Sequence, residues 1–396
     1  MNVYKIWIGS LAVALTFGLV ACGGGGGGGT PDSDGDGVPN ISDSFAADAA
    51  RFVALETLTD DTPGTTFSVA VAASNDLAPV IVVGQSDQGG TTLIGQRWSL
   101  DPSQLDPAVT PQDLDPLAGE IYSAAYGVNA AGLAVGESTA NLDVNTVPVY
   151  WAAGSGIPTP LSLTVGLDTF TDGAAYGVND AGQIVGELIR GDGSRMAVLW
   201  QPDLGVYGDP VSLPELETGL SATAHAINAA GQIAGESLTA GGMRGALWQV
   251  SAAGAVLGNT VNLGTIVGHA SSSAFGIDAL GQVVGESVAV NGTVRGVRWV
   301  MDGAAVSDIV QLGDDTSAMA ISAETGRVVG SSLTGAEVRA AIWDNNSVDS
   351  TNADAVLSSG PDLYTPSTGS SRAYGMTSSG VVVGLALDRA YVAIPR

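Results

Sequence analysis

The chain has 396 residues, of which 56 are glycine and 6% are aromatic, and its formal net charge is −27. A negative charge of this size excludes nucleic acid and anionic membrane surfaces as electrostatic partners, because both carry charge of the same sign. The many glycines and few aromatic residues are typical of a chain with many tight turns.

Residues 1–21 have the pattern of a secretory signal peptide. Lys5 precedes an apolar stretch, Ile6–Val20, which suits a signal-peptide core and is short for a membrane span. The stretch ends in L-V-A-C at Cys22, the only cysteine of the chain. This ending resembles a bacterial lipobox, in which the cysteine is acylated and becomes the new N-terminus. A signal peptide with an incidental cysteine is the alternative.

The lipobox resemblance implies a bacterial outer-membrane lipoprotein, periplasmic or surface-exposed, because Gly23 stands where enteric lipoproteins of the inner membrane have Asp. Acyl chains would hold such a protein to the membrane without spanning it. Residues 22–31, with the glycine run Gly23–Gly29, then form a flexible tether. Cleavage would remove Lys5, the only lysine, and so change the charge from −27 to −28.

Residues 32–50 form a linker that contains an acidic loop, D-S-D-G-D-G-V-P-N-I-S-D. Oxygen ligands at loop positions 1, 3, 5, 7, 9 and 12, with Gly at 6, are the spacing of a Ca²⁺ loop of EF-hand type. Because no helical pattern flanks it, the loop resembles a thrombospondin type 3 calcium repeat more closely than an EF-hand. An acidic linker without metal is the alternative. The predicted Ca²⁺ ligands are Asp32, Asp34, Asp36, the carbonyl of Val38, Asn40 and Asp43.

From residue 67 onward one sequence unit recurs, and its clearest copy is A-Y-G-V-N-D-A-G-Q-I-V-G-E, Ala175–Glu187. Each copy begins with a short run of alternating residue types that ends in Asn, Asp, Ser or Thr. A turn sequence that contains Gly follows, and then a run of β-branched residues, so each copy predicts a β-hairpin. Six intervals between the terminal glycines span 300 residues, a period of 50, which is typical of propellers, solenoids and arrays. These glycines are Gly84, Gly136, Gly186, Gly235, Gly285, Gly330 and Gly384.

Each repeat holds about four predicted strands, which is the content of a β-propeller blade. The third strand ends in tryptophan in six repeats, at Trp98, Trp151, Trp200, Trp248, Trp299 and Trp343. The sequence therefore predicts an all-β, seven-bladed β-propeller over residues 51–396. Its repeats lie near residues 67–98, 124–151, 174–200, 223–248, 273–299, 317–343 and 372–394.

The two ends of the array predict how the ring closes. Six repeats continue past the tryptophan position into a further strand, whereas the seventh ends at Arg396. The run R-F-V-A-L-E-T-L, Arg51–Leu58, precedes the first repeat and matches the missing strand. We therefore expect Phe52–Leu58 to pair into the blade built from Ala373–Ile394, which would leave no exposed sheet edge. An open solenoid is the rival architecture.

The repeat unit resembles the HAF-type extracellular repeats of bacteria, whose signature A-x-G-I-N-x-x-G-Q-V-V-G-E-S is followed by a short run into Trp. The resemblance covers residues 67–394 and implies an extracellular repeat protein. The family has no assigned activity, so it supplies no functional residues. The first and last copies depart from the pattern, with Gln85 and Leu385 at the Glu position and Ala393 at the Trp position.

A ring of carboxylates is the main candidate site within the repeats, formed by Glu137, Glu187, Glu236 and Glu286. Such a ring could bind a cation or supply an acid and a base. The structural alternative, which we favour, is that Glu236 faces Arg244, or Glu286 faces Arg295, across one hairpin. Those arginines share a second repeat position with two others, the set being Arg244, Arg295, Arg339 and Arg389.

The two histidines do not predict a zinc site. His225 stands where other copies have Tyr or Phe, so we expect a core residue there. His269 lies in a spacer with no cysteine and no second histidine nearby.

The sequence contains no nucleophile elbow, phosphate-cradling loop or zinc-protease motif. It therefore favours an outer-membrane-anchored, calcium-binding extracytoplasmic propeller that acts as a binding or scaffold module. We expect a monomer whose partner is an unidentified protein or glycan. The alternative is a secreted, Ca²⁺-dependent hydrolase or lyase that uses carboxylates at the axial funnel.

Overall fold

The computed structural model describes residues 7–8, 11–12, 50–54, 67–74, 79–88, 92–101, 110–141, 145–303, 305–334, 337–343, 370–386 and 389–395. Cys22 and the acidic loop of residues 32–43 lie outside this part of the chain. The described residues form strands and turns, and no helix among them is long and apolar enough to cross a membrane. A two-residue pairing of β1 (Trp7–Ile8) with β2 (Leu11–Ala12) comes first.

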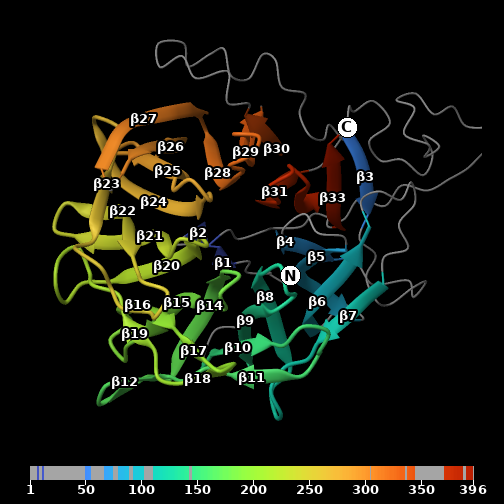
Figure 1. Ribbon diagram of the computed structural model, residues 1–396. Coiled ribbons are helices and arrows are strands. Elements are labelled where there is room, and N and C mark those ends of the chain that lie inside the picture. Colours follow the sequence, from blue (N-terminus) through green and yellow to red (C-terminus); the bar gives the residue numbers. More distant parts are fainter. Residues whose placement is uncertain are drawn as a thin grey trace, which may run out of the picture.

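Seven antiparallel sheets follow one another around a central axis in chain order, so the predicted seven-bladed β-propeller is confirmed (Figure 1). Blade 1 contains β4 (Ser68–Ala73), β5 (Val80–Gln88), β6 (Thr92–Leu100) and β7 (Thr110–Leu114). Blade 2 contains β8 (Tyr122–Val128), β9 (Ala134–Thr139), β10 (Val147–Trp151) and β11 (Pro158–Pro160). Blade 3 contains β14 (Asp172–Val178), β15 (Ile184–Ile189), β16 (Arg195–Trp200) and β19 (Val211–Ser212).

The second half of the ring repeats this order. Blade 4 contains β20 (Ala222–Ile227), β21 (Gln232–Thr239), β22 (Gly242–Gln249) and β23 (Val261–Gly264). Blade 5 contains β24 (His269–Ile277), β25 (Val283–Ala289), β26 (Val294–Asp302) and β27 (Ala305–Asp314). The described strands of blade 6 are β28 (Thr316–Ile321), β29 (Val328–Thr334) and β30 (Glu337–Trp343). Blade 7 contains β31 (Ser371–Met376), β32 (Val382–Ala386), β33 (Arg389–Pro395) and β3 (Ala50–Ala54).

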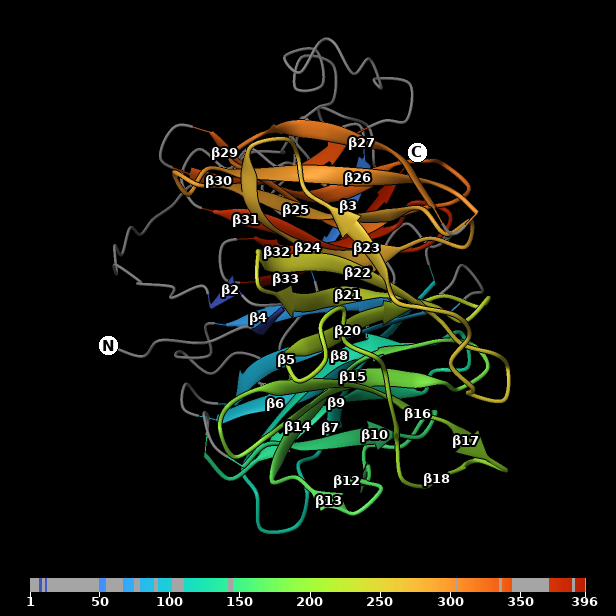
Figure 2. The same cartoon turned by 90° about the vertical axis from the view of Figure 1, so that its left-hand side faces the viewer.

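Two short hairpins interrupt the regular blades. The pair β12 (Thr164–Val165) and β13 (Asp168–Thr169) precedes blade 3, and the pair β17 (Pro202–Asp203) and β18 (Val206–Tyr207) lies between β16 and β19. Both hairpins lie at the margin of the molecule, away from the axis (Figure 2).

The ring closes by strand exchange, as predicted. β3 lies antiparallel to β33, with Arg51 opposite Ile394 and Val53 opposite Val392 (Figure 1). The observed pairing covers Ala50–Ala54, whereas residues 55–58 of the expected strand lie outside the described part of the chain. Across the seam, the amide of Ala390 donates to the hydroxyl of Ser68 at 2.8 Å, which ties blade 7 to blade 1.

The tryptophans at the shared repeat position are all at most 2% exposed, and each packs against the preceding blade. Trp248, for example, lies in one apolar cluster with Val185 and Leu199 of blade 3. Trp98 makes the same kind of contact across the seam, in a cluster with Val383 and Val392 of blade 7. The core is therefore a closed series of blade interfaces, each filled by one large side chain.

Every inner hairpin has a β-bulge at the second residue of an A-x-G or A-x-A motif. In blade 3 the pairing jumps from Ala175 opposite Gly186 to Gly177 opposite Val185, which leaves Tyr176 unpaired. A Cβ added at Gly186 would lie 2.0 Å from the carbonyl oxygen of Ala174, so only glycine fits opposite the bulge. The seven bulged residues are Val71, Tyr126, Tyr176, His225, Phe275, Met319 and Tyr374.

We predict that Gly186→Ala destabilises the protein by about 3 kcal/mol or more, because backbone must move to relieve the contact. Gly208→Ala is the matched control, since an added Cβ there meets no atom within 4 Å. The control should stay within about 0.5 kcal/mol of the wild type. Guanidinium unfolding followed by tryptophan fluorescence measures both. Similar stability of the two variants would contradict the steric argument.

Candidate functional site in the axial channel

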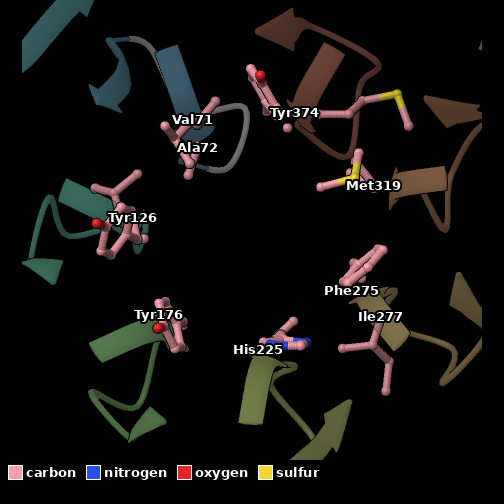
Figure 3. Close-up of a pocket in the computed structure, with 18 of the residues that line it drawn as sticks. Val71, Ala72, Tyr126, Tyr176, His225, Phe275, Ile277, Met319 and Tyr374 are labelled. Carbon is pink, nitrogen blue, oxygen red and sulfur yellow. The ribbon is translucent and has the colours of Figure 1, made fainter. Parts of the chain in front are cut away.

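The inner strands of all seven blades surround a cavity of about 230 Å³ on the propeller axis (Figure 3). Each strand contributes three consecutive residues, beginning with the bulged one. The third residue of each triplet, directly before the turn, is apolar, as with Ile227 and Ile277. The channel is thus built from the A-x-G-I segment of the repeat, which the sequence analysis treated as structural.

The bulge explains which side chain faces the axis. An extra residue in one strand re-aims its side chain relative to the regular alternation. The next position is Gly or Ala in every blade, because neighbouring inner strands approach closely there. A Cβ on Gly177 would lie 2.9 Å from the carbonyl oxygen of His225 in blade 4. The large bulged side chains therefore alternate with bare backbone around the wall.

Four consecutive blades present rings to the channel. The centroid of Tyr126 lies 5.5 Å from that of Tyr176, Tyr176 lies 6.0 Å from His225, and His225 lies 5.6 Å from Phe275. We call Tyr126, Tyr176, His225 and Phe275 the aromatic arc. Figure 3 shows these side chains, with Met319, Tyr374 and Val71, around an open centre.

The predicted carboxylate positions lie behind this wall, not in it. The hydroxyl of Tyr126 donates to Oε1 of Glu137 at 2.8 Å, and that of Tyr176 donates to Oε1 of Glu187 at 3.0 Å. The hydroxyl oxygen of Tyr126 lies on the outer side of its ring, away from the centre of the channel (Figure 3). No glutamate belongs to the described lining of the cavity.

Glu187 is 2% exposed and fully engaged. Nη1 of Arg195 donates to both carboxylate oxygens at 3.0 Å. The hydroxyl of Thr223, in blade 4, donates to Oε2 at 2.8 Å. Because Arg195 lies on the same blade as Glu187 and Thr223 on the next, this carboxylate binds two blades together.

Glu137 and Glu286 hold protons more tightly than exposed glutamates. Burial raises the pKa of Glu286 to about 7, with a further increase from nearby Glu236, while the hydrogen bond from Ser317 at 3.2 Å opposes the shift. Burial likewise raises the pKa of Glu137 to about 7, against the lowering effect of the Tyr126 hydrogen bond. Both groups therefore titrate near neutral pH.

The predicted pairing of Glu236 with Arg244, or of Glu286 with Arg295, is wrong. Arg244 donates to the backbone carbonyls of Gly241, Met243 and Ala270. Arg295 forms its ion pair with Asp314.

The reason for the error is the alternation of strand faces. Arg244 is opposite Ser237 in the ladder, one residue out of step with Glu236, so the two side chains point to opposite faces of the sheet. In blade 3, Arg195 is opposite Ile189, which lies two residues after Glu187 on the same strand. Arg195 and Glu187 therefore point to the same face of the sheet. Blade 3 consequently forms the ion pair with an arginine that the sequence analysis did not single out.

His225, which was expected to be a core residue, is 9% exposed and lies in the wall of the channel. Its Nδ1 lies 2.8 Å from the carbonyl oxygen of Ala274 in blade 5. Because a carbonyl oxygen only accepts, Nδ1 carries the proton in this contact. Within the described residues, no group of three or more His, Cys, Asp or Glu side chains is placed to hold a metal ion.

The sequence analysis missed the channel-lining residues. Their signal was present, because the variable residue of A-x-G is Tyr, His or Phe in five of the seven copies. The bulge is not visible in the sequence, and a regular strand, in which side chains alternate between the two faces, gives no reason to place that residue on the axis.

Comparisons with known proteins gave no family for this chain. No family model matches it, and no curated protein matches its sequence. Among solved structures, one match is a polysaccharide lyase described as an ulvan lyase bound to -[GlcA(1-4)Rha3S]-. That match has a TM-score of 0.49 and 10% sequence identity, and it covers 87% of this chain and 95% of the other.

We predict opposite effects for the same substitution at two carboxylates. The folded-state pKa of Glu286, about 7, lies above its ordinary value of 4.5, so folding takes up protons between these values. Its contribution to stability is therefore present below about pH 4.5 and is lost as pH rises through 7. At pH 8, Glu286→Gln should raise the free energy of unfolding by about 1–3 kcal/mol relative to the wild type.

Glu187→Gln is the contrasting variant. It leaves Arg195 without its carboxylate and should lower stability by about 3 kcal/mol at pH 8. Denaturant unfolding of both variants and the wild type between pH 5 and 8 measures the two effects. A difference between Glu286→Gln and the wild type that does not vary with pH would contradict the assigned titration.

Proposed function

We propose that this protein is a binding or scaffold module of the cell envelope that takes its ligand in the axial channel. The observation that carries the proposal is the wall of the channel, which combines the aromatic arc with bare backbone from all seven blades. Ligand sites are concave, largely apolar and aromatic, with few polar groups. A site built from every blade also depends on the whole ring being closed.

The alternative, a hydrolase or lyase that works through the repeat carboxylates, is less well supported. Such chemistry needs a carboxylate within hydrogen-bond reach of the substrate. Glu187 is instead held by Arg195, Tyr176 and Thr223, and Glu137 receives the hydroxyl of Tyr126. We therefore favour binding without turnover.

The binding site can be tested by filling it. Ala73 lines the channel at a position where the other blades carry the larger Val, Ile or Met, so Ala73→Phe should narrow the channel. Because Ala73 also packs against the apolar cluster at the seam, thermal melting of the variant verifies that the ring is intact. Ala253→Phe, on an exposed turn, is the matched control. The mature protein would be screened against glycan and peptide arrays, and against glycoside substrates for turnover, with Ca²⁺ present.

For any ligand found, we expect Ala73→Phe to weaken binding about tenfold or more and the control to bind as the wild type does. Undiminished binding by Ala73→Phe would place the ligand elsewhere. Turnover that disappears on changing a repeat glutamate would favour the enzyme alternative.

We also propose that Cys22 anchors the protein to the outer membrane. Support comes from the sequence, since the residue follows L-V-A and is the only cysteine. Labelling cells with an alkyne fatty acid should mark the wild type and not Cys22→Ser. An unlabelled wild type released into the medium would contradict the anchor.

We further propose that residues 32–43 bind one Ca²⁺ and stiffen the tether. The spacing of their oxygen ligands supports this, with Asp in place of Glu at the last position favouring a loose site. Extracellular modules of this kind have dissociation constants on the order of 10⁻⁴–10⁻³ M. Calorimetry on the mature protein should show a site that Asp34→Ala with Asp36→Ala abolishes. If the heat of Ca²⁺ binding is unchanged in the double variant, the loop is a linker that binds no metal.

A further inference from the structure

The aromatic arc and the repeat carboxylates occur in the same four blades. Blades 2 to 5 supply Tyr126, Tyr176, His225 and Phe275 to the channel. The same blades supply, on their second strands, Glu137, Glu187, Glu236 and Glu286. In blades 1, 6 and 7 the channel position is Val71, Met319 and Tyr374, and the carboxylate position is Gln85, Ser331 and Leu385. One side of the channel therefore combines rings with acidic groups behind them.

Buried carboxylates lie behind the aromatic arc. Among the described residues, the ion pair assigned to this carboxylate position is that of Arg195 with Glu187. The described lining of the channel contains no lysine or arginine. Tyr126 and Tyr176 direct their hydroxyls outward to Glu137 and Glu187, so what they leave for the channel is ring carbon. Ring faces and buried carboxylates both favour positive charge.

We propose that the axial channel binds a small organic cation, of the quaternary ammonium class, against the aromatic arc. This inference rests on the proposed function, because it takes the channel to be the binding site. A bare metal ion fits less well, since the lining offers no carboxylate and a hard cation requires oxygen ligands. An anion would be repelled by the acidic groups behind the wall. A quaternary ammonium group needs no hydrogen bond and suits a wall of ring carbon.

The affinity should depend on pH. Glu137 faces Tyr126 and the charge of Glu187, and Glu286 faces Ser317 and the charge of Glu236. Because Glu137 and Glu286 have pKa values of about 7, both become more fully charged as pH rises from 6 to 8. A cation in the channel stabilises the charged forms, so its binding should tighten over this range.

The test compares choline with 3,3-dimethyl-1-butanol, which has the same shape and no charge. Both are titrated into the mature protein by calorimetry or ligand-observed NMR, with Ca²⁺ present, at pH 6 and pH 8. We expect choline to bind at least about tenfold more tightly than the neutral compound at pH 8. Choline binding should weaken several-fold at pH 6, whereas binding of the neutral compound should not change.

Two variants make the same chemical change at different places. Phe275→Leu removes from the arc a ring that is 8% exposed and lies against His225, and it should weaken choline binding about three- to tenfold. Phe170→Leu removes a buried ring from the apolar cluster of blade 3, outside the channel, and should leave the affinity unchanged. Thermal melting of each variant verifies that the ring is intact.

The outcomes separate this inference from the proposed function. Equal affinity for choline and its neutral isostere, or a loss shared by Phe275→Leu and Phe170→Leu, overturns the cation preference and leaves the channel as a binding site. The cation preference is also overturned if the wild type does not bind choline while Ala73→Phe abolishes binding of the ligand found on the arrays. In that case, too, the channel remains a binding site. Array binding that survives in Ala73→Phe overturns both.

Discussion

The contact between a glycine and a carbonyl group, repeated in all seven inner hairpins, is the constraint on which the rest of the structure depends. An added Cβ at the glycine that ends each V-V-G motif would lie 1.9–2.1 Å from a backbone oxygen of the innermost strand. Any side chain in place of the glycine hydrogen would clash with this oxygen. The bulge beside this contact inserts one extra, unpaired residue into the inner strand. That same bulge turns the variable residue of A-x-G toward the axis. One steric requirement thus fixes both the glycine of the signature and the wall of the channel.

The asparagine of the signature joins successive blades. The side-chain oxygen of Asn179 accepts amides within its own turn, from Ala181 and Gln183, while its Nδ2 donates to the carbonyl of Asn228 at 3.0 Å. Asn228 repeats this arrangement toward Asp278. In blade 5 the equivalent residue is Asp278, whose carboxylate accepts amides of its turn but has no N–H to donate to the next blade. In blade 6 the hydroxyl of Ser322 donates to the carbonyl of Ser378 in blade 7. A single amide side chain therefore closes a turn and connects neighbouring blades.

The fold could be predicted because each of its determinants is local and repeated. Hairpin turns, tryptophan spacing and the spare N-terminal strand are all visible in one linear pattern, and strand exchange at β3 and β33 follows from counting strands. The site could not be predicted in the same way. Assigning Arg244 to Glu236 required knowing which face each occupies, and a shift of one residue inverts that face. In the same way, the axial position of Tyr176 follows from a bulge that the alternating pattern conceals. Blade 7 illustrates compensation between positions: Ala393 replaces the tryptophan, and buried Tyr391, two residues earlier on the same face, lies against Gly384.

The four carboxylates are where this chain departs from what its fold requires. Gln85 and Leu385 occupy the same repeat position, are 7% and 6% exposed, and leave their blades intact, so the architecture does not need an acid there. Glu286 is 4% exposed and has no arginine partner within the described residues. Its burial, with Glu236 nearby, disfavours the charged form and raises its pKa to about 7. The fold bears this cost in the blades that carry the aromatic arc, whereas blades without a carboxylate have Val71, Met319 or Tyr374 at the channel. Local departures from what a fold requires tend to mark functional sites. Every blade that carries one of these carboxylates also presents a ring to the channel, and of the three blades without one, only blade 7 has a ring there, Tyr374. This association ties the carboxylates to the channel more closely than to the propeller as such.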